Sequence, residues 1–340
     1  MRTWRLSAKL SVRKSIRALA LGAIGLVLVP GGAVAQDLIG GRFTWDGSEN
    51  GLWADAGNWT IGRPPGPNAD LTFPASGFWH TTVNNYASGA GFGLITYTGA
   101  GYEVFGNPLV LMDGVRATHA TGVTSFGADI ILGADASFLA QDAGTTLNLG
   151  GLLTLGGSYA ATFDGAGLVQ VSNIIRRAPG FGGGVSIIKE GAGTTLLTKS
   201  NDLSSGQVWV RTGTLALAHN FALGDAGTTI VLEGATLALG GNLRLDSGPI
   251  GLAGTLRSDL GANVVSDMIA LTGSNAIFAV PTSLTVSGVV AGASGFIMMG
   301  GGTLRFAANN TYSGPTLLKP GLLIVDGSQP SSPIQLDGGT

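Results

Sequence analysis

Short alternations of apolar and polar residues, each closed by a turn rich in glycine, asparagine or aspartate, run through the chain from about residue 75 to residue 340. Examples are 145–149, 153–155, 214–217 and 236–239. A period of two indicates a strand with one buried face, because successive side chains of a strand point to opposite sides. Strands this short are compatible with a sandwich, a barrel or a solenoid. The pattern therefore predicts an all-β protein.

The composition supports this prediction. The chain has 58 glycines in 340 residues, and a glycine inside a helix costs about 1 kcal/mol relative to alanine, which argues against long helices. Only 11% of the residues are charged while 44% are hydrophobic, the opposite of what a disordered chain shows. The absence of cysteine excludes disulfides and thiolate metal sites.

Internal repetition favours the solenoid over the sandwich and the barrel. At an offset of 108 residues, 193–196 aligns with 301–304, and Leu215 aligns with Leu323. A second match, at an offset of 104 residues, aligns Ile230 and the six residues after it with the end of the chain. Repeats whose strands each bury one face against the next coil are typical of solenoids.

We therefore predict a parallel β-helix over 75–340, with its clearest copies at 191–241 and 299–340. Leucines at matching positions of the two copies should point into one continuous core, because each would occupy the buried face of its strand. These residues are Leu196, Leu215, Leu304 and Leu323.

The later copy contains an Asn-Thr-Tyr-Ser-Gly sequence that begins at Asn310 and is followed by Thr316, Gly321 and Leu323. This pattern resembles the autotransporter-associated β-strand repeat, also called the passenger-associated transport repeat. The earlier copy departs from the pattern, with Asp-Leu-Ser at 202–204. The resemblance implies a right-handed parallel β-helix, exported across the inner membrane of a Gram-negative cell as a passenger domain.

Residues 1–35 have the features of a signal peptide. Six basic residues precede or border an apolar run at 18–30, and Ala33-Val34-Ala35 has the form of a signal peptidase site. The run is shorter than the ~20 residues of a spanning helix, which favours cleavage between Ala35 and Gln36 over a membrane anchor. We expect the general secretion machinery and signal peptidase as partners, and an extracellular or outer-surface location.

The remaining chain has no segment long and apolar enough to be a transmembrane helix. Without residues 1–35 it keeps 12 Lys and Arg against 20 Asp and Glu, a net charge of −8. An acidic surface repels phosphate backbones, which argues against nucleic acid as a partner.

Residues 36–74 form a tryptophan-rich segment. The end of a solenoid needs a cover for its open core, and large aromatic side chains can provide one. We therefore predict an amino-terminal cap. The alternative is an aromatic platform that binds surface glycans or other cells, and its candidate ligand-binding residues are Trp53, Trp59, Phe78 and Trp79.

No pattern for catalytic residues, a metal site or a cofactor emerges. His80, His119 and His219 lack the short spacings of a metal motif. The densest charge patch, Arg176-Arg177 near Lys189-Glu190, is predicted to be a solvated face of the β-helix.

The predicted function is a secreted or cell-surface stalk or display scaffold without catalysis. A carbohydrate- or cell-binding adhesin on the same scaffold is the first alternative. A polysaccharide lyase or hydrolase is the second, and it would need clustered carboxylates, for example Asp129 or Asp135 beside Asp164 on an adjacent coil.

The chain stops at Thr340, in the middle of a repeat. We therefore expect a passenger fragment truncated at its carboxyl end, which a membrane β-barrel would follow in the full gene.

Overall fold

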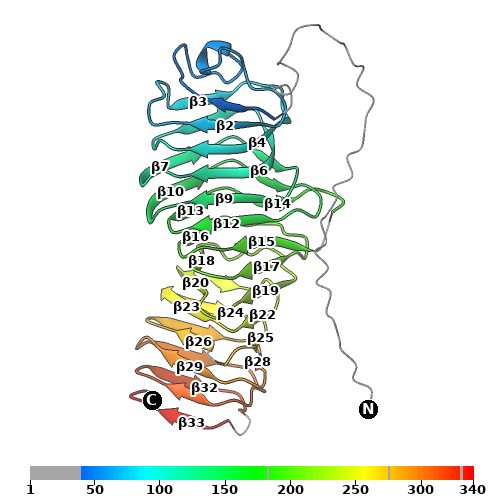
Figure 1. Ribbon diagram of the computed structural model, residues 1–340. Helices are drawn as coiled ribbons and strands as arrows, with labels where there is room; N and C mark the ends of the chain where they lie inside the picture. The colour runs from blue at the N-terminus through cyan, green and yellow to red at the C-terminus, as the bar shows by residue number, and fades with distance from the viewer. Residues whose placement is uncertain (1–39, 182–183, 275, 330–331) are drawn as a thin grey trace, which may run out of the picture. The chain divides into compact units, whose positions relative to one another are not determined.

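The structure is a computed structural model that describes residues 40–181, 184–274, 276–329 and 332–340. The predicted signal peptide and its cleavage site lie outside the described residues. The described chain is a parallel β-solenoid in which successive coils stack along one axis (Figure 1). Its helical content is a single short 3₁₀ turn, η1 (Ala56–Asn58). The described chain therefore contains no helix that is long and apolar enough to cross a membrane.

The first sheet has 15 strands. Its main path runs through β1 (Arg42–Thr44), β2 (Ala69–Phe73), β4 (Ala90–Tyr97), β6 (Leu109–Ala117), β9 (Ala136–Ala140), β12 (Ala161–Gly165), β15 (Val185–Lys189), β17 (Gln207–Val210), β19 (Thr228–Val231), β22 (Ile250–Leu252), β25 (Ile269–Leu271) and β28 (Val290–Ala291). Three further strands branch from β6 along a third side of the coils: β8 (Ile130–Leu132), β11 (Leu153–Leu155) and β14 (Ile175–Arg177).

The second sheet has 13 strands and reaches from the first coils to the last. They are β3 (Thr81–Asn84), β5 (Glu103–Gly106), β7 (Thr121–Phe126), β10 (Gly144–Leu149), β13 (Leu168–Val171), β16 (Thr194–Leu197), β18 (Thr214–Leu217), β20 (Thr236–Gly240), β23 (Thr255–Leu260), β26 (Ala276–Ala279), β29 (Phe296–Met299), β31 (Thr316–Leu318) and β33 (Ile334–Leu336). The third sheet has five: β21 (Arg244–Leu245), β24 (Ala262–Val265), β27 (Ser283–Val286), β30 (Thr303–Phe306) and β32 (Leu322–Val325).

The strands stack in parallel register, so that like side chains lie above one another. Leu215 of β18 pairs with Leu237 of β20, which in turn pairs with Leu256 of β23, and all three are fully buried. Such ladders fill one continuous core. Burying each leucine stabilises the fold by ~1.5–3 kcal/mol, so the alternation in the sequence is also the main source of stability.

Side-chain amides hold the corners between strands. The Ile175 amide N–H donates to Asn201 Oδ1 (2.7 Å), and the Val290 amide N–H donates to Asn310 Oδ1 (2.9 Å). In each case an asparagine of one coil satisfies a backbone donor of the coil before it. This contact explains why asparagines recur at the turns, since a buried donor without a partner would be costly.

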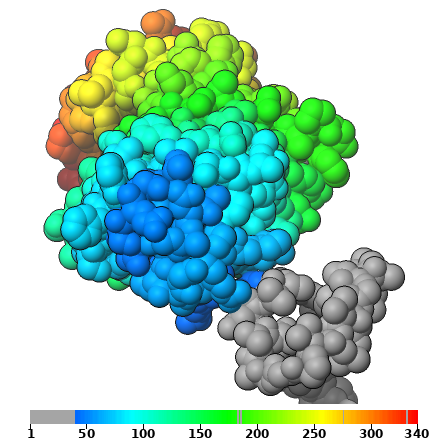
Figure 2. Space-filling model, turned by 90° about the horizontal axis from the view of Figure 1, so that it is seen from above, coloured from blue at the N-terminus to red at the C-terminus, as the bar shows by residue number. Residues whose placement is uncertain are grey.

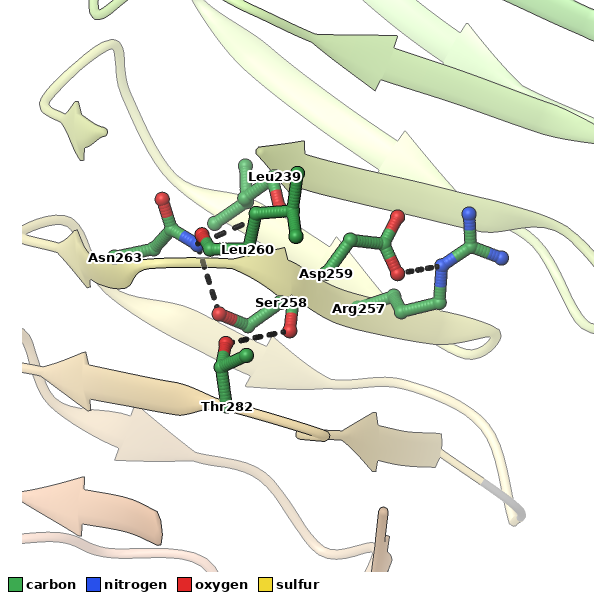
Figure 3. A network of polar contacts seen from close by, with 7 residues as sticks. All are labelled: Leu239, Arg257, Ser258, Asp259, Leu260, Asn263 and Thr282. Carbon is green, nitrogen blue, oxygen red and sulfur yellow. Dashed lines mark hydrogen bonds and ion pairs between the residues drawn. The ribbon is translucent and has the colours of Figure 1, made fainter. Parts of the chain in front are cut away.

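The corner between β23 and β24 shows the same device in a larger network (Figure 3). Asn263 Nδ2 donates to Ser258 Oγ (2.8 Å) and to the carbonyl oxygen of Leu260 (2.9 Å), while Asn263 Oδ1 accepts from the Leu243 N–H (2.7 Å). Thr282 Oγ1 of the next coil donates to the Ser258 carbonyl oxygen (3.1 Å). These groups satisfy one another, which marks the network as a structural corner.

The tyrosine of the Asn-Thr-Tyr-Ser-Gly sequence is part of the core. Tyr312 is fully buried, its ring centroid lies 5.4 Å from that of Phe296, and its hydroxyl hydrogen-bonds with Thr316 Oγ1 (2.8 Å). Asn310 binds the preceding coil from the same segment. Within three residues the motif therefore supplies an asparagine that hydrogen-bonds to the preceding coil and an aromatic ring that packs in the core.

One expectation about the core is wrong. Leu215 and Leu304 are buried and Leu323 packs partly against the core, but Leu196 points outward while Thr195 and Leu197 are buried. The reason is that β16 begins at Thr194, so its second residue faces inward. A shift of one residue moves every side chain of a strand to the other face.

The aligned copies also lie on different sides of the solenoid. β16 and β18 belong to the second sheet, whereas β30 and β32 belong to the third. Both pairs are short alternating strands that follow glycine, so their sequences match although their places in the coil differ.

The tryptophan-rich segment covers the amino-terminal end of the solenoid (Figure 2, blue). Trp45, Trp53 and Trp59 are buried, with the rings of Trp45 and Trp59 centred 5.2 Å apart and Trp53 centred 5.6 Å from Phe92 of β4. Trp59 Nε1 donates to the carbonyl oxygen of Trp53 (2.8 Å). The cluster extends the core beyond β2, as a cap does.

Candidate functional site

The structure divides the four predicted ligand-binding residues into two pairs. Trp53 and Trp59 lie inside the cap, 0% and 1% exposed. Phe78 and Trp79 lie on the segment before β3 and are 85% and 49% exposed. The backbone of this segment is held to the cap, because the Trp79 carbonyl oxygen accepts from Trp45 Nε1 (3.0 Å). Only the second pair offers ring surface to a ligand.

The candidate carboxylates do not come together. Asp129 Oδ1 accepts from the Leu152 N–H (2.8 Å), just before β11, whereas Asp135 Oδ1 accepts from the Ala160 N–H (2.9 Å), just before β12. Asp164 lies near the other end of β12. Four residues of extended chain separate Ala160 from Asp164, a span of about 13 Å. Asp129 and Asp135 each support a corner, and neither pairs with Asp164.

The histidines also have separate environments. His119 is buried at the corner between β6 and β7, where Nδ1 lies 3.1 Å from the Thr121 carbonyl oxygen and Nε2 lies 3.1 Å from Thr124 Oγ1. Burial lowers the pKa of His119, although the Thr121 contact partly opposes the shift. The ring of His80 stacks on Tyr102 at 4.2 Å. Within the described part of the chain, no three His, Asp or Glu side chains are placed to hold a metal ion.

Two cations of the predicted solvated face are buried, so that prediction is wrong for them. Arg177 is 3% exposed, and it donates to the Gly157 carbonyl oxygen (2.9 Å) and to Ser186 Oγ (2.6 Å). Lys189 is 1% exposed, and its Nζ donates to the carbonyl oxygens of Glu190 and Gly191. Both cations hold backbone oxygens at corners.

Burial lowers the pKa of both side chains. The pKa of Lys189 falls to about 8, because burial disfavours the ammonium more than the nearby Asp164 and Glu190 carboxylates favour it. Alternation could have revealed the two residues, since each stands two positions after a buried isoleucine, Ile175 or Ile187.

Comparison with known proteins gives one match. The chain is 27% identical over 218 residues, 64% of its length, to the adhesin BmaC autotransporter of Brucella suis biovar 1 (strain 1330). The matched stretch is 5% of that protein, so the chain spans only about a twentieth of the relative. No protein-family model and no solved structure matches the chain. The similarity agrees with a passenger-like solenoid, and membership of the specific repeat family stays a prediction.

Proposed function

We propose that this chain is a scaffold of the cell surface, a passenger-like rod that holds whatever it carries away from the membrane. The observation that carries the proposal is the second sheet, whose 13 strands run without a break from β3 to β33. At about 4.8 Å per strand this ladder is roughly 58 Å long. The similarity to part of an autotransporter adhesin supports a surface location.

The proposed export route begins with the predicted signal peptide, followed by cleavage between Ala35 and Gln36. Amino-terminal sequencing of the exported protein would give Gln36 as its first residue. Retention of residues 1–35 in a membrane fraction would contradict the cleavage and leave the scaffold role standing.

Protease treatment of intact cells tests the surface location. An antibody against the full-length chain should label intact cells, and external protease should remove that label while a cytoplasmic control protein survives. Labelling that appears only after lysis would contradict the proposal.

Adhesion is the second candidate function. The exposed rings of Phe78 and Trp79 favour it, and so does the similarity to part of an autotransporter adhesin. A variant with both residues changed to alanine should be displayed at the wild-type level yet adhere less to glycan-coated surfaces. Equal adhesion of the two proteins would remove this loop as a binding site.

A further inference from the structure

One side of the solenoid is interrupted near its middle. In most coils a short strand joins a second-sheet strand to the next first-sheet strand, as β14 joins β13 to β15 and β21 joins β20 to β22. Between β14 and β21 the ladder is reduced to a single bridge between Arg176 and Asp202. In the next coil, residues 221–225 form a turn. The stacked strands that elsewhere close this side are therefore missing here.

This interruption produces a cleft with a volume of about 490 Å³. Gly224 forms part of its wall at a φ of 58°, and a Cβ on Gly224 would lie 2.5 Å from the Asn201 carbonyl oxygen. Asn201 ties the two coils together, because its Nδ2 donates to the Ala222 carbonyl oxygen (2.6 Å). The wall is thus built from closely packed backbone, which keeps the cleft in a defined shape.

An aromatic ring and three carboxylates line the cleft. Phe221 is 52% exposed, because its neighbours Ala222 and Leu223 take the inward positions of the turn. Asp202, Asp225 and Asp246 are exposed and come from three successive coils. The lining contains no cationic side chain.

Backbone donors orient two of the carboxylates. Asp225 Oδ1 accepts from the Leu203 N–H (2.9 Å), and Asp202 Oδ1 accepts from the Ser204 N–H (3.2 Å). The second oxygen of each carboxylate, and both oxygens of Asp246, make no hydrogen bond or ion pair with the described residues. The cleft thus presents two carboxylates that backbone donors orient, a third that is exposed and has no contact of this kind within the described chain, and an exposed ring.

We propose that this cleft binds a segment of an uncharged glycan. Sugar hydroxyls donate hydrogen bonds to carboxylate oxygens, and the C–H face of a pyranose packs on an aromatic ring. The cleft is largely open to solvent, which leaves room for a segment of a longer chain. Acidic sugars would be repelled by three unpaired carboxylates. A metal ion does not fit, because no three carboxylates of the described residues converge on one point.

The three carboxylates come from three successive coils, and strands of successive coils lie about 4.8 Å apart along the axis. A glycan chain that lies across the coils would therefore meet one acidic side chain in each coil. The exposed ring of Phe221 favours the glycan, and an extended basic peptide is the competing ligand that the salt dependence of binding separates from it.

An oligosaccharide array and three variants test the proposal. The full-length chain is applied to printed neutral, amino and acidic oligosaccharides, and the best neutral ligand is measured by titration calorimetry. Phe221→Ala should weaken its binding at least about tenfold, and Asp246→Asn about fivefold. The matched control is Phe105→Ala, because Phe105 is 49% exposed and lies on β5, outside the cleft. It should bind as the wild type does.

The possible results distinguish a neutral glycan from other ligands. Absence of neutral ligands from the array, or equal binding by wild type, Phe221→Ala and Asp246→Asn, would overturn the proposal. Binding to basic peptides that 0.5 M salt abolishes (roughly a 4 Å Debye length) would assign the cleft to a charged partner instead. Circular dichroism and urea midpoints confirm that the variants fold. Failure of glycan binding would leave surface display unaffected, because the cell-labelling experiment measures location alone.

Discussion

Lys189 should make the stability of the protein rise with pH. Its pKa is about 8 in the folded protein and 10.5 when unperturbed. Between these values the folded state has lost a proton that the unfolded state still binds, so the free energy of unfolding increases with pH. From pH 7.5 to 9.5 the increase amounts to about 2 kcal/mol. Tyr86 and Tyr102 oppose this rise only at higher pH, because burial raises the pKa of each to about 12 and their destabilising effect begins near pH 10.

The assay compares the wild type with Lys189→Met, a side chain of similar length without a charge. Urea unfolding of both proteins is followed from pH 7.5 to 9.5, and the free energies are subtracted so that other titrating groups cancel. The wild type should gain about 2 kcal/mol on the variant over this range. Lys189→Arg, which stays charged, should show no such gain. A difference that is constant with pH, or that shrinks, would refute the reasoning.

Two further predictions concern the core. Thr195→Val should raise the urea midpoint of unfolding by the equivalent of ~1–2 kcal/mol. The reason is that Thr195 is buried in the ladder between Val169 and Leu215, where its hydroxyl has no hydrogen-bond partner. A lower midpoint than that of the wild type would contradict this prediction. Tyr312→Ala should lower the stability of the last coils by ~3–5 kcal/mol, whereas Tyr312→Phe should lower it by only about 1 kcal/mol, because it keeps the ring. Amide exchange of β31 measures both losses. Equal losses of stability would show that the ring does not support this coil.

Alternation predicted the all-β class and the stacking of parallel coils, because a period of two and an internal repeat are local properties of the sequence. It did not assign strands to sheets. Thr194 and Thr303 both begin strands after a glycine, yet β16 lies on the second sheet and β30 on the third. The side of the coil depends on how sharply each preceding turn bends the chain, and residue type specifies that bend only loosely.

The candidate sites were harder to predict than the fold. Trp53 and Phe78 are both large aromatic residues near the amino terminus, and only the packed cap separates a core ring from an exposed one. The loss of alternation near Phe221 is visible in the sequence, but the cleft arises because two successive coils, those between β14 and β21, lack a strand on the same side. That coincidence is a property of the three-dimensional stack.

The direction of the hydrogen bonds has a mechanical consequence. They join coil to coil along the axis, so tension applied between the two ends would pull on them lengthwise and separate the coils one at a time. From Thr194 to Thr214 a coil contains 20 residues, and its release would add up to about 70 Å of extended chain. A rod of this kind would yield under load in small steps while the remaining coils stayed intact, and each lost coil could close again onto the exposed edge of its neighbour.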